Sequence, residues 1–319
     1  MCLTAIGSRI VIIAITFLIT LGFARHEALS QVKGAVSTLT AAKEKAVMKG
    51  RALCVGIDKF KNLDQEYQLD GCVQDANDME ALLIARKGFA KGDIVKLTNT
   101  QATKAEIMKH LKAMVEGAQQ GKFNYLVFSL SSHGMQVPDT SGDEPDGLDE
   151  GVCTYDLTTA GDGNWWDPKT YILDDEFCEL FSKLPENVLL EVYLDTCHSG
   201  TGIKIPGQPK DVKVRWIPPP SGRALQELEN RTLRGVEKTF LDRGIRAPHI
   251  LWAACKSDER SQARPINGRY HGLFTYAYCK VTNENPTLED RNEVLLKVRD
   301  EVEQWMVYPQ TPQLEIYQK

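Results

Sequence analysis

Apolar and amphipathic segments alternate along residues 50–305, and this alternation predicts the fold. Apolar runs typical of buried strands occupy residues 52–57, 94–97, 125–130, 188–194 and 250–254. Between and after them, apolar residues recur at helical spacing within residues 75–85, 103–115, 175–184, 274–281 and 288–305. Strands that alternate with helices indicate an α/β fold, a sandwich in which helices flank a mostly parallel sheet with right-handed crossovers.

A separate apolar segment lies at the amino terminus. Residues 10–24 contain no charged side chain and are flanked by Arg9 and Arg25. A helix of this length rises only about 22 Å, short of the roughly 30 Å hydrocarbon core. Small residues at Gly22 and Ala24 suit cleavage after Ala24. Residues 1–24 are therefore predicted to be a signal peptide, or alternatively an uncleaved membrane anchor, and the rest of the chain is expected to be periplasmic or extracellular.

The net charge and the cysteine pattern argue against several classes of function. The net charge is -5 over 319 residues, which argues against a nucleic-acid partner, because such proteins carry basic patches. The eight cysteines form no Cys-x-x-Cys pair, so zinc and thioredoxin-type chemistry have little support. Removal of the leader would leave seven cysteines, and an odd number implies at least one unpaired thiol.

Two strand ends carry the candidate chemistry. The run 125–130 leads into Ser131-Ser132-His133-Gly134, and the run 188–194 leads into Asp195-Thr196-Cys197-His198-Ser199-Gly200. Ligands bind at the carboxyl ends of strands in open α/β sheets. If the two strands are neighbours, the His133 imidazole can activate the Cys197 thiol as a nucleophile. A lone histidine or cysteine would be an ordinary core residue, but two beside glycines predict a catalytic pair.

Neighbouring groups refine this prediction. Adjacent side chains on an extended segment point to opposite sides, so His198 is poorly placed to accept the Cys197 proton. Backbone N–H groups at Gly134 and Cys197 are candidates for holding a developing oxyanion.

In combination, these stretches resemble the metacaspases, which are caspase-fold cysteine peptidases, in particular the microbial, orthocaspase-like kind. The resemblance covers residues 50–319, with supporting stretches at residues 69–76, 142–150, 172–176 and 249–312. It implies a caspase-like α/β/α sandwich. It also implies a division into a linker (25–50), a large p20-like catalytic part (51–203), an inter-subunit linker or insertion (204–247) and a small p10-like part (248–319).

The resemblance also implies roles for individual residues. His133 and Cys197 match the catalytic dyad, and Asp75 and Asp195 match carboxylates of the pocket for the residue before the scissile bond, with Cys72 and Ser131 beside them. Carboxylates in a partly dry pocket pair with Arg or Lys, and the Gln-Ala-Cys signature of animal caspases is missing. The expected activity is cleavage after Arg or Lys. For Asp75, the alternative is a helix N-terminal cap.

Calcium is a second implication of the resemblance, since many relatives need it, although the chemistry itself requires no cofactor. The candidate ligands are Asp146, Asp149, Asp174 and Asp175, because calcium prefers carboxylate oxygens. The loop lacks EF-hand spacing, and Lys204 stands where many calcium-dependent relatives carry an acid. A solvated acidic loop is the alternative.

The long polar stretch after the cysteine motif is rich in basic residues. An enzyme specific for basic residues could cut itself there, since exposed segments are preferred cleavage sites, although a plain surface insertion is the alternative. The candidate positions are Lys204, Lys210, Arg215, Arg223, Arg231, Arg234, Lys238 and Arg243. Expected partners are protein or peptide substrates, and the resemblance implies a monomer. The functional alternatives are a non-catalytic binding or signalling module on the same fold and another cysteine hydrolase such as a transpeptidase.

Overall fold

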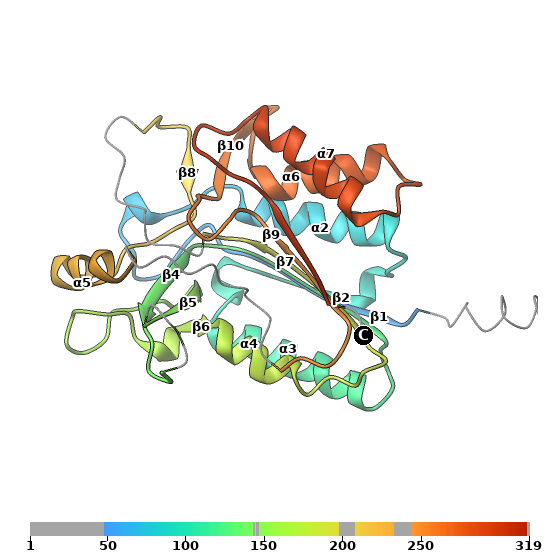
Figure 1. Ribbon diagram of the computed structural model, residues 1–319, viewed down its shortest axis with the longest axis horizontal. Helices are drawn as coiled ribbons and strands as arrows, with labels where there is room; N and C mark the ends of the chain where they lie inside the picture. The colour runs from blue at the N-terminus through green and yellow to red at the C-terminus, as the bar shows by residue number, and fades with distance from the viewer. Residues whose placement is uncertain (1–47, 143, 145–146, 198–207, 233–243, 318–319) are drawn as a thin grey trace, which may run out of the picture. The chain divides into compact units, whose positions relative to one another are not determined.

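The computed structural model describes residues 48–142, 144, 147–197, 208–232 and 244–317 (Figure 1). Several sequence-based predictions fall outside these residues: the leader and most of the following linker, Asp146, His198, Gly200, and the candidate self-cleavage positions Lys204, Arg234, Lys238 and Arg243. Within the described ranges, no helix is both long and apolar enough to cross a membrane.

A six-stranded sheet forms the centre of residues 49–317. Its strands lie in the order β12-β9-β7-β3-β1-β2, and all neighbours run parallel except β12, which is antiparallel to β9. The mostly parallel sheet expected from the sequence is therefore confirmed. The strand bounds are β1 (Gly50–Gly56), β2 (Ile94–Thr98), β3 (Tyr125–Ser131), β7 (Leu189–Asp195), β9 (His249–Ala253) and β12 (Gln313–Tyr317).

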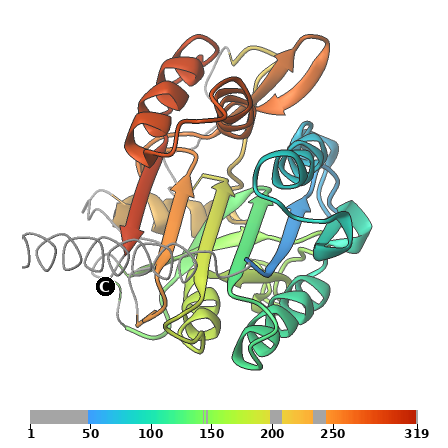
Figure 2. The ribbon, with the colours of Figure 1, turned by 90° about the vertical axis from the view of Figure 1, so that its right-hand side faces the viewer.

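Helices cover both faces of this sheet (Figures 1 and 2). The alternation along β1 shows how: Leu53 and Val55 belong to one core cluster, and Ala52 and Cys54 belong to the other. The first cluster lies against α3 (Lys104–Gln119) and α4 (Asp174–Phe181), and the second lies against α2 (Cys72–Arg86), α6 (Leu273–Glu284) and α7 (Arg291–Glu303).

Helix ends follow local capping rather than apolar spacing alone. Thr103 Oγ1 accepts the N–H of Glu106 at 3.3 Å, which confirms the predicted start of α3. The last long helix was expected from Leu288 but begins at Arg291, because Asp290 accepts the N–H groups of Asn292 and Glu293.

Two small sheets and one helix lie at the carboxyl-terminal end of the large sheet. The antiparallel sheet β4-β5-β6 follows β3 directly, and the sheet β11-β10-β8 joins a segment after β9 to one after β7. The bounds are β4 (Gly134–Pro138), β5 (Leu148–Cys153), β6 (Tyr171–Leu173), β8 (Lys213–Val214), β10 (Gln262–Ile266), β11 (Arg269–Gly272) and α5 (Gly222–Thr232).

Candidate active site

The two motif-bearing strands are direct neighbours. Ser131, the last residue of β3, pairs with Asp195, the last residue of β7, so His133 and Cys197 each lie two residues beyond the same rung. Gly134 packs against the backbone of Cys197 so closely that a Cβ at position 134 would overlap the Cys197 carbonyl group. The glycine after the histidine is thus required for the two strand ends to approach one another.

His133 is held as a neutral base. The ring is 3% exposed, and its Nε2 lies 2.8 Å from the carbonyl oxygen of Tyr67. Because a carbonyl only accepts hydrogen bonds, Nε2 carries the proton of the neutral ring and Nδ1 keeps its lone pair. Nδ1 is buried without a hydrogen-bond partner among the described residues. Burial lowers the pKa of His133 to about 4, against the raising effect of the Tyr67 hydrogen bond, so at neutral pH the ring is uncharged and Nδ1 carries no proton.

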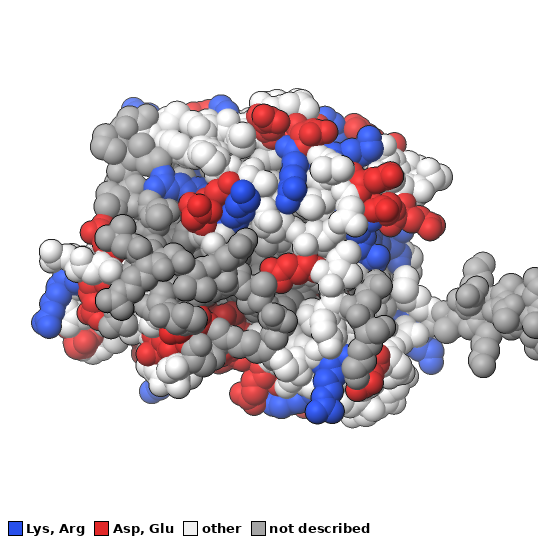
Figure 3. All heavy atoms as spheres, in the orientation of Figure 1, with Lys and Arg blue, Asp and Glu red and all other residues white. Residues whose placement is uncertain are grey.

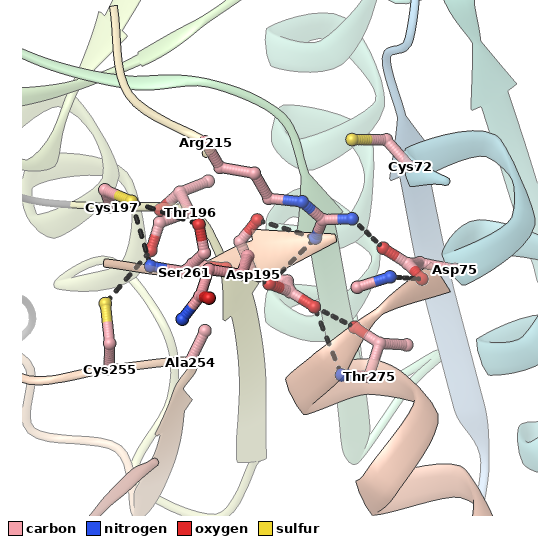
Figure 4. Close-up of polar contacts among 12 residues, drawn as sticks. Cys72, Asp75, Asp195, Thr196, Cys197, Arg215, Ala254, Cys255, Ser261 and Thr275 are labelled. Carbon is pink, nitrogen blue, oxygen red and sulfur yellow. Dashed lines mark hydrogen bonds and ion pairs between the residues drawn. The ribbon is translucent and has the colours of Figure 1, made fainter. Parts of the chain in front are cut away.

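The Cys197 thiol is fully buried beside Ser261. Its Sγ accepts the Ser261 N–H at 3.0 Å and lies 3.5 Å from the Ser261 carbonyl oxygen. Cys255 lies on the other side of this backbone (Figure 4), and its hydrogen bond with Cys197, together with burial, raises its pKa well above the usual value. Cys255 therefore stays a thiol at neutral pH.

Asp75 and Asp195 converge on one guanidinium, that of Arg215. Arg215 Nη2 lies 2.5 Å from Asp75 Oδ2, and Nη1 lies 2.8 Å from Asp195 Oδ1. All three side chains are essentially inaccessible to solvent, and Figure 4 shows the arginine extended between the two acids, with the Cys72 sulfur on its far side. Ser131 is placed by its backbone pairing with Asp195. We call Asp75 and Asp195 the carboxylate pocket.

The helix-cap alternative for Asp75 is wrong. The N-cap of α2 is Gly71, with no side-chain cap, and Asp75 lies inside the first turn. Its carboxylate accepts the N–H of Gly272 at 2.9 Å and the guanidinium of Arg215. Burial, the largest effect, raises the pKa of Asp75 to about 6, with Asp195 adding to the rise and Arg215 opposing it.

Residues from the carboxyl-terminal part complete the pocket. Asp195 accepts hydrogen bonds from Ser261 Oγ at 2.5 Å and from the N–H and Oγ1 of Thr275 at 3.1 and 2.7 Å. Gly272 forms a wall, because a Cβ there would lie 2.5 and 2.6 Å from the Arg215 Nη atoms. Burial opposes the charge of Arg215, but Asp195 and Asp75 outweigh it and hold its pKa well above its usual range.

The backbone of Arg215 meets the two N–H groups that the sequence singled out. Its carbonyl oxygen accepts the N–H of Gly134 at 2.9 Å and that of Cys197 at 3.2 Å. Its own N–H donates to the Ser261 carbonyl at 3.0 Å. One residue thus contacts both the carboxylate pocket and a pair of donors suited to an oxyanion.

The acidic residues form a group different from the predicted one. Oxygens of Glu144, Glu150 and Asp174 lie within 4.8 Å of one another and are buried. Burial raises the pKa of Asp174 to about 8, helped by the charges of Glu150, Asp175 and Asp149. Among the described residues, Asp174 is thus the one predicted calcium ligand in this group, while Asp149 and Asp175 lie near it but outside it. Figure 3 shows carboxylates gathered over the β4-β5-β6 part of this face.

Sequence reasoning did not name several of these residues. Arg215 was only one of eight candidate self-cleavage points, and Tyr67, Ser261, Gly272 and Thr275 had no site role. The stretch from Gly272 to Thr275 was noticed only through resemblance. The contact of Tyr67 with His133 and that of Ser261 with Cys197 are made by backbone atoms, which leave no signature in side-chain chemistry.

Comparison with known proteins agrees with this geometry. Residues 50–206 match the family model of the metacaspase, peptidase C14 domain. Metacaspase-1A of Aspergillus niger is 30% identical over 298 residues, covering 83% of this chain and 70% of that protein. Metacaspase-1 of Cryptococcus neoformans is 29% identical over 299 residues, covering 83% and 62%.

Solved structures share the fold. Protein GSU0716 from Geobacter sulfurreducens is 26% identical, with a TM-score of 0.59, over 84% of this chain and 93% of that one. Caspase-1 from Spodoptera frugiperda is 13% identical, with a TM-score of 0.52, over 85% and 89%, which shows a common fold alone. The expected caspase-like fold is therefore confirmed, and this chain belongs to the metacaspases of peptidase family C14 and is a cysteine-type peptidase.

Proposed function

We propose that the protein is an endopeptidase that cleaves peptide bonds after Arg or Lys, with Cys197 as nucleophile and His133 as general base. The observation that carries this proposal is Arg215, whose guanidinium lies between Asp75 and Asp195 while its carbonyl meets the Gly134 and Cys197 N–H groups. A substrate arginine bound in the same way would offer its carbonyl carbon to the Cys197 sulfur.

The proposed reaction uses these groups in turn. The thiol proton moves to His133 Nδ1, whose lone pair is free because Nε2 donates to Tyr67. The thiolate attacks the carbonyl carbon, and the N–H groups of Gly134 and Cys197 bind the oxygen as its negative charge develops. The imidazolium then protonates the leaving amine, and water hydrolyses the thioester with the imidazole again acting as base.

Specificity for a basic residue follows from charge. Two buried carboxylates close together are costly unless a cation lies between them, and a guanidinium can bind both at once. An aspartate or an apolar side chain would leave both charges unpaired, so such substrates are expected to be rejected. Lysine is expected to be accepted less well, because its point charge cannot contact both acids with planar geometry.

The direct test uses reporter peptides that end in Arg, Lys or Asp. We expect cleavage after Arg and Lys only, and a loss of at least about a thousandfold in kcat/KM for Cys197→Ala. Cys279→Ala, a change of one thiol in the core beside Met79, is the matched control and should keep activity. Preference for Asp, or turnover that survives Cys197→Ala, would contradict the proposal. Transfer to an added amine that outpaces hydrolysis would indicate a transpeptidase.

We propose further that calcium binds at Glu144, Glu150 and Asp174 and activates the enzyme. The fit rests on three buried carboxylates within 4.8 Å and on Asp174 Oδ1, which has no hydrogen-bond partner among the described residues. Hard oxygen donors are what calcium prefers, and a divalent cation would offset both the burial and the carboxylate repulsion that raise the Asp174 pKa. Backbone oxygens and water would complete the coordination.

Calcium binding can be measured without activity. Titration calorimetry on the Cys197→Ala protein should show binding that Asp174→Asn weakens at least about tenfold. Asp162→Asn, a change at an exposed acid, is the control and should bind normally. Binding that Asp174→Asn leaves unchanged would contradict this site, and activity that a chelator leaves unchanged would contradict activation.

Three further proposals rest on the sequence alone. We propose that the enzyme processes itself within residues 204–247, that it acts as a monomer, and that residues 1–24 direct it out of the cytoplasm. Mass spectrometry of the purified protein would locate cuts, sedimentation would give its mass, and a reporter fused to residues 1–30 would report export. A chain that stays intact under activating conditions would contradict self-processing. A dimer would contradict the monomer, and a reporter that stays in the cytoplasm would contradict export.

A further inference from the structure

We propose that residues 213–217, which we call the cleft strand, are a built-in inhibitor that fills the substrate cleft in the manner of a substrate, so that the intact chain is latent. The inference rests on the proposed cleavage after basic residues. It assigns the Arg215–Trp216 peptide bond to the position of a scissile bond, and it names the contacts that must break before another substrate can bind.

The amino-terminal side of the cleft strand is bound as an added β-strand. Lys213 and Val214 pair antiparallel with Ala263 and Gln262 of β10, and the Arg215 N–H continues the ladder by donating to Ser261. Extended peptides commonly bind by such addition to a sheet edge, where backbone hydrogen bonds supply affinity and side-chain pockets supply specificity. The edge of β10 that would receive a substrate is therefore already paired.

The specificity pocket and the oxyanion donors are filled as well. The Arg215 side chain is 0% exposed and forms ion pairs with both acids of the carboxylate pocket. Its carbonyl uses both the Gly134 and the Cys197 N–H groups. A second arginine cannot enter while these contacts hold, and Cys197 and His133 are correspondingly buried.

The carboxyl-terminal side of the bond is anchored too. Trp216 forms a bridge with Gly134, and the Ile217 N–H donates to the Gly134 carbonyl at 3.0 Å. The Trp216 side chain is buried in a cluster with Leu148, Leu228 and Cys197. Just beyond the cleft strand, the Pro218 carbonyl accepts Trp166 Nε1 at 3.2 Å.

Anchoring on both sides has a chemical consequence. If Cys197 attacks the Arg215 carbonyl, the C–N bond to Trp216 breaks, a thioester to Arg215 forms, and the freed Trp216 amine takes the proton from His133. Because Trp216 and Ile217 remain held, that amine stays beside the thioester and can attack it to re-form the peptide bond and the thiol. Such proximity greatly favours the reverse step over hydrolysis, so cutting this bond does not by itself open the cleft.

Tethering makes the inhibitor effective. A segment of the same chain competes with a free substrate at an effective concentration in the millimolar range. Latency therefore ends only when the cleft strand leaves β10 and Arg215 leaves the carboxylate pocket, and the apparent affinity for substrate falls by the fraction of molecules in which this has happened.

The decisive experiment measures access to the cleft in two ways, by the initial rate on an Arg reporter peptide and by the rate at which iodoacetamide alkylates Cys197. Arg215→Gln should raise both rates about tenfold or more relative to the wild-type chain. The matched control is Arg223→Gln, because Arg223 is exposed at the start of α5 and lies outside the cleft strand; it should behave as wild type.

A second variant covers the case in which Arg215→Gln is poorly folded. Ile217→Pro removes the hydrogen bond to Gly134 and a buried core side chain but leaves both acids of the carboxylate pocket in place, and it should also speed alkylation. A synthetic peptide of residues 211–219 should slow both reactions of the Arg215→Gln protein, whereas the same peptide with Gln in place of Arg215 should not.

The outcomes separate the two proposals. Equal alkylation rates in wild type, Arg215→Gln and Ile217→Pro would overturn the inhibitor, even if Arg peptides are cleaved. Faster alkylation without cleavage of any Arg or Lys peptide would leave the cleft strand as an inhibitor and overturn the proposed specificity. If circular dichroism shows that Arg215→Gln is unfolded, the alkylation rate of Ile217→Pro decides, and the 211–219 peptide should slow that rate as well.

Discussion

At the scale of single residues, Gly272 decides what the carboxylate pocket can hold. A Cβ at this position would lie 2.3 Å from Asp195 Oδ2 and 2.5–2.6 Å from both Nη atoms of the bound arginine, closer than side-chain atoms approach. Gly272→Ala should therefore lower kcat/KM for Arg peptides by about a hundredfold, the cost of displacing a reacting group by about an ångström.

The control for this prediction is Gly92→Ala, since a Cβ at Gly92 meets no atom within 4 Å. That variant should keep the wild-type kcat/KM. An unchanged rate in Gly272→Ala, with the protein folded, would show that substrates do not bind as Arg215 does.

Asp75 should set the acid limb of the pH profile. Burial raises its pKa from 3.8 to about 6, so it gains a proton as the pH falls through about 6 and loses its attraction for arginine. His133, with a pKa of about 4, stays neutral in that range. kcat/KM for Arg peptides should fall as the pH falls through about 6 or a higher value, because Arg215 lowers the Asp75 pKa and its departure removes that effect.

The pH profile of kcat/KM for the wild-type enzyme checks this prediction, with Asp75→Asn as the comparison. The variant should be slow throughout and should lack the limb near pH 6. A wild-type limb near the His133 value of about 4 would instead assign it to the base.

Functional residues that directly follow a predicted strand could be identified from the sequence. Functional residues that reach the site from distant parts of the chain were missed. His133 and Cys197 stand directly after apolar runs, so local pattern was enough to pair them. Arg215, Ser261 and Gly272 have no such signal, since they reach the site only because β8, β10 and β11 pair with one another. The acid prediction considered aspartates alone and so omitted Glu144 and Glu150.

At the scale of elements, β7 carries a buried charge in the middle of the sheet. Glu191 is fully buried and accepts hydrogen bonds from the Tyr125 hydroxyl and, at 3.1 Å, from Trp252 Nε1, while Lys87 lies 3.4 Å away. Burial opposes its charge, but Lys87 and the Tyr125 hydrogen bond outweigh this and lower its pKa.

Tyr125→Phe should therefore reduce the free energy of unfolding by about 1–3 kcal/mol, because it leaves a buried acceptor without one of its donors. Urea unfolding would measure the change. Tyr317→Phe, at the 39% exposed end of β12, is the control and should be within about 0.5 kcal/mol of wild type. No difference between the two would mean that Glu191 does not depend on the hydroxyl.

Element prediction succeeded for five of the six strands of the large sheet and for its helices, because their apolar spacing is long and regular, but it missed the edge strand β12. It failed for β8, β10 and β11, which are two to five residues long and rich in charged and polar side chains. Such strands form because they pair with a segment far away in the sequence. The hydrophobic pattern within one short segment does not reveal that partner.

At the scale of the whole molecule, the sequence alone predicted the α/β/α sandwich. It did not predict that residues after Cys197 contribute to the active site. The alternation of strands and helices is enough for a parallel sheet, and the strand order then brings β3 beside β7. What it does not reveal is that a stretch beyond Cys197, interpreted as linker or insertion, contributes the strand bound in the cleft. The division at residues 204–247 remains a prediction.

The pairing of β7 with β9 has one last consequence. Five rungs, from Leu190–His249 to Leu194–Ala253, join the strand that ends at the nucleophile to the strand that opens the final part of the chain, and α2 and α6 share one core cluster across the same divide. A nicked enzyme should therefore persist as a two-chain particle: two bands in detergent, a single mass under native conditions. A cut between β7 and β9 would divide the chain in two but would leave the fold in place.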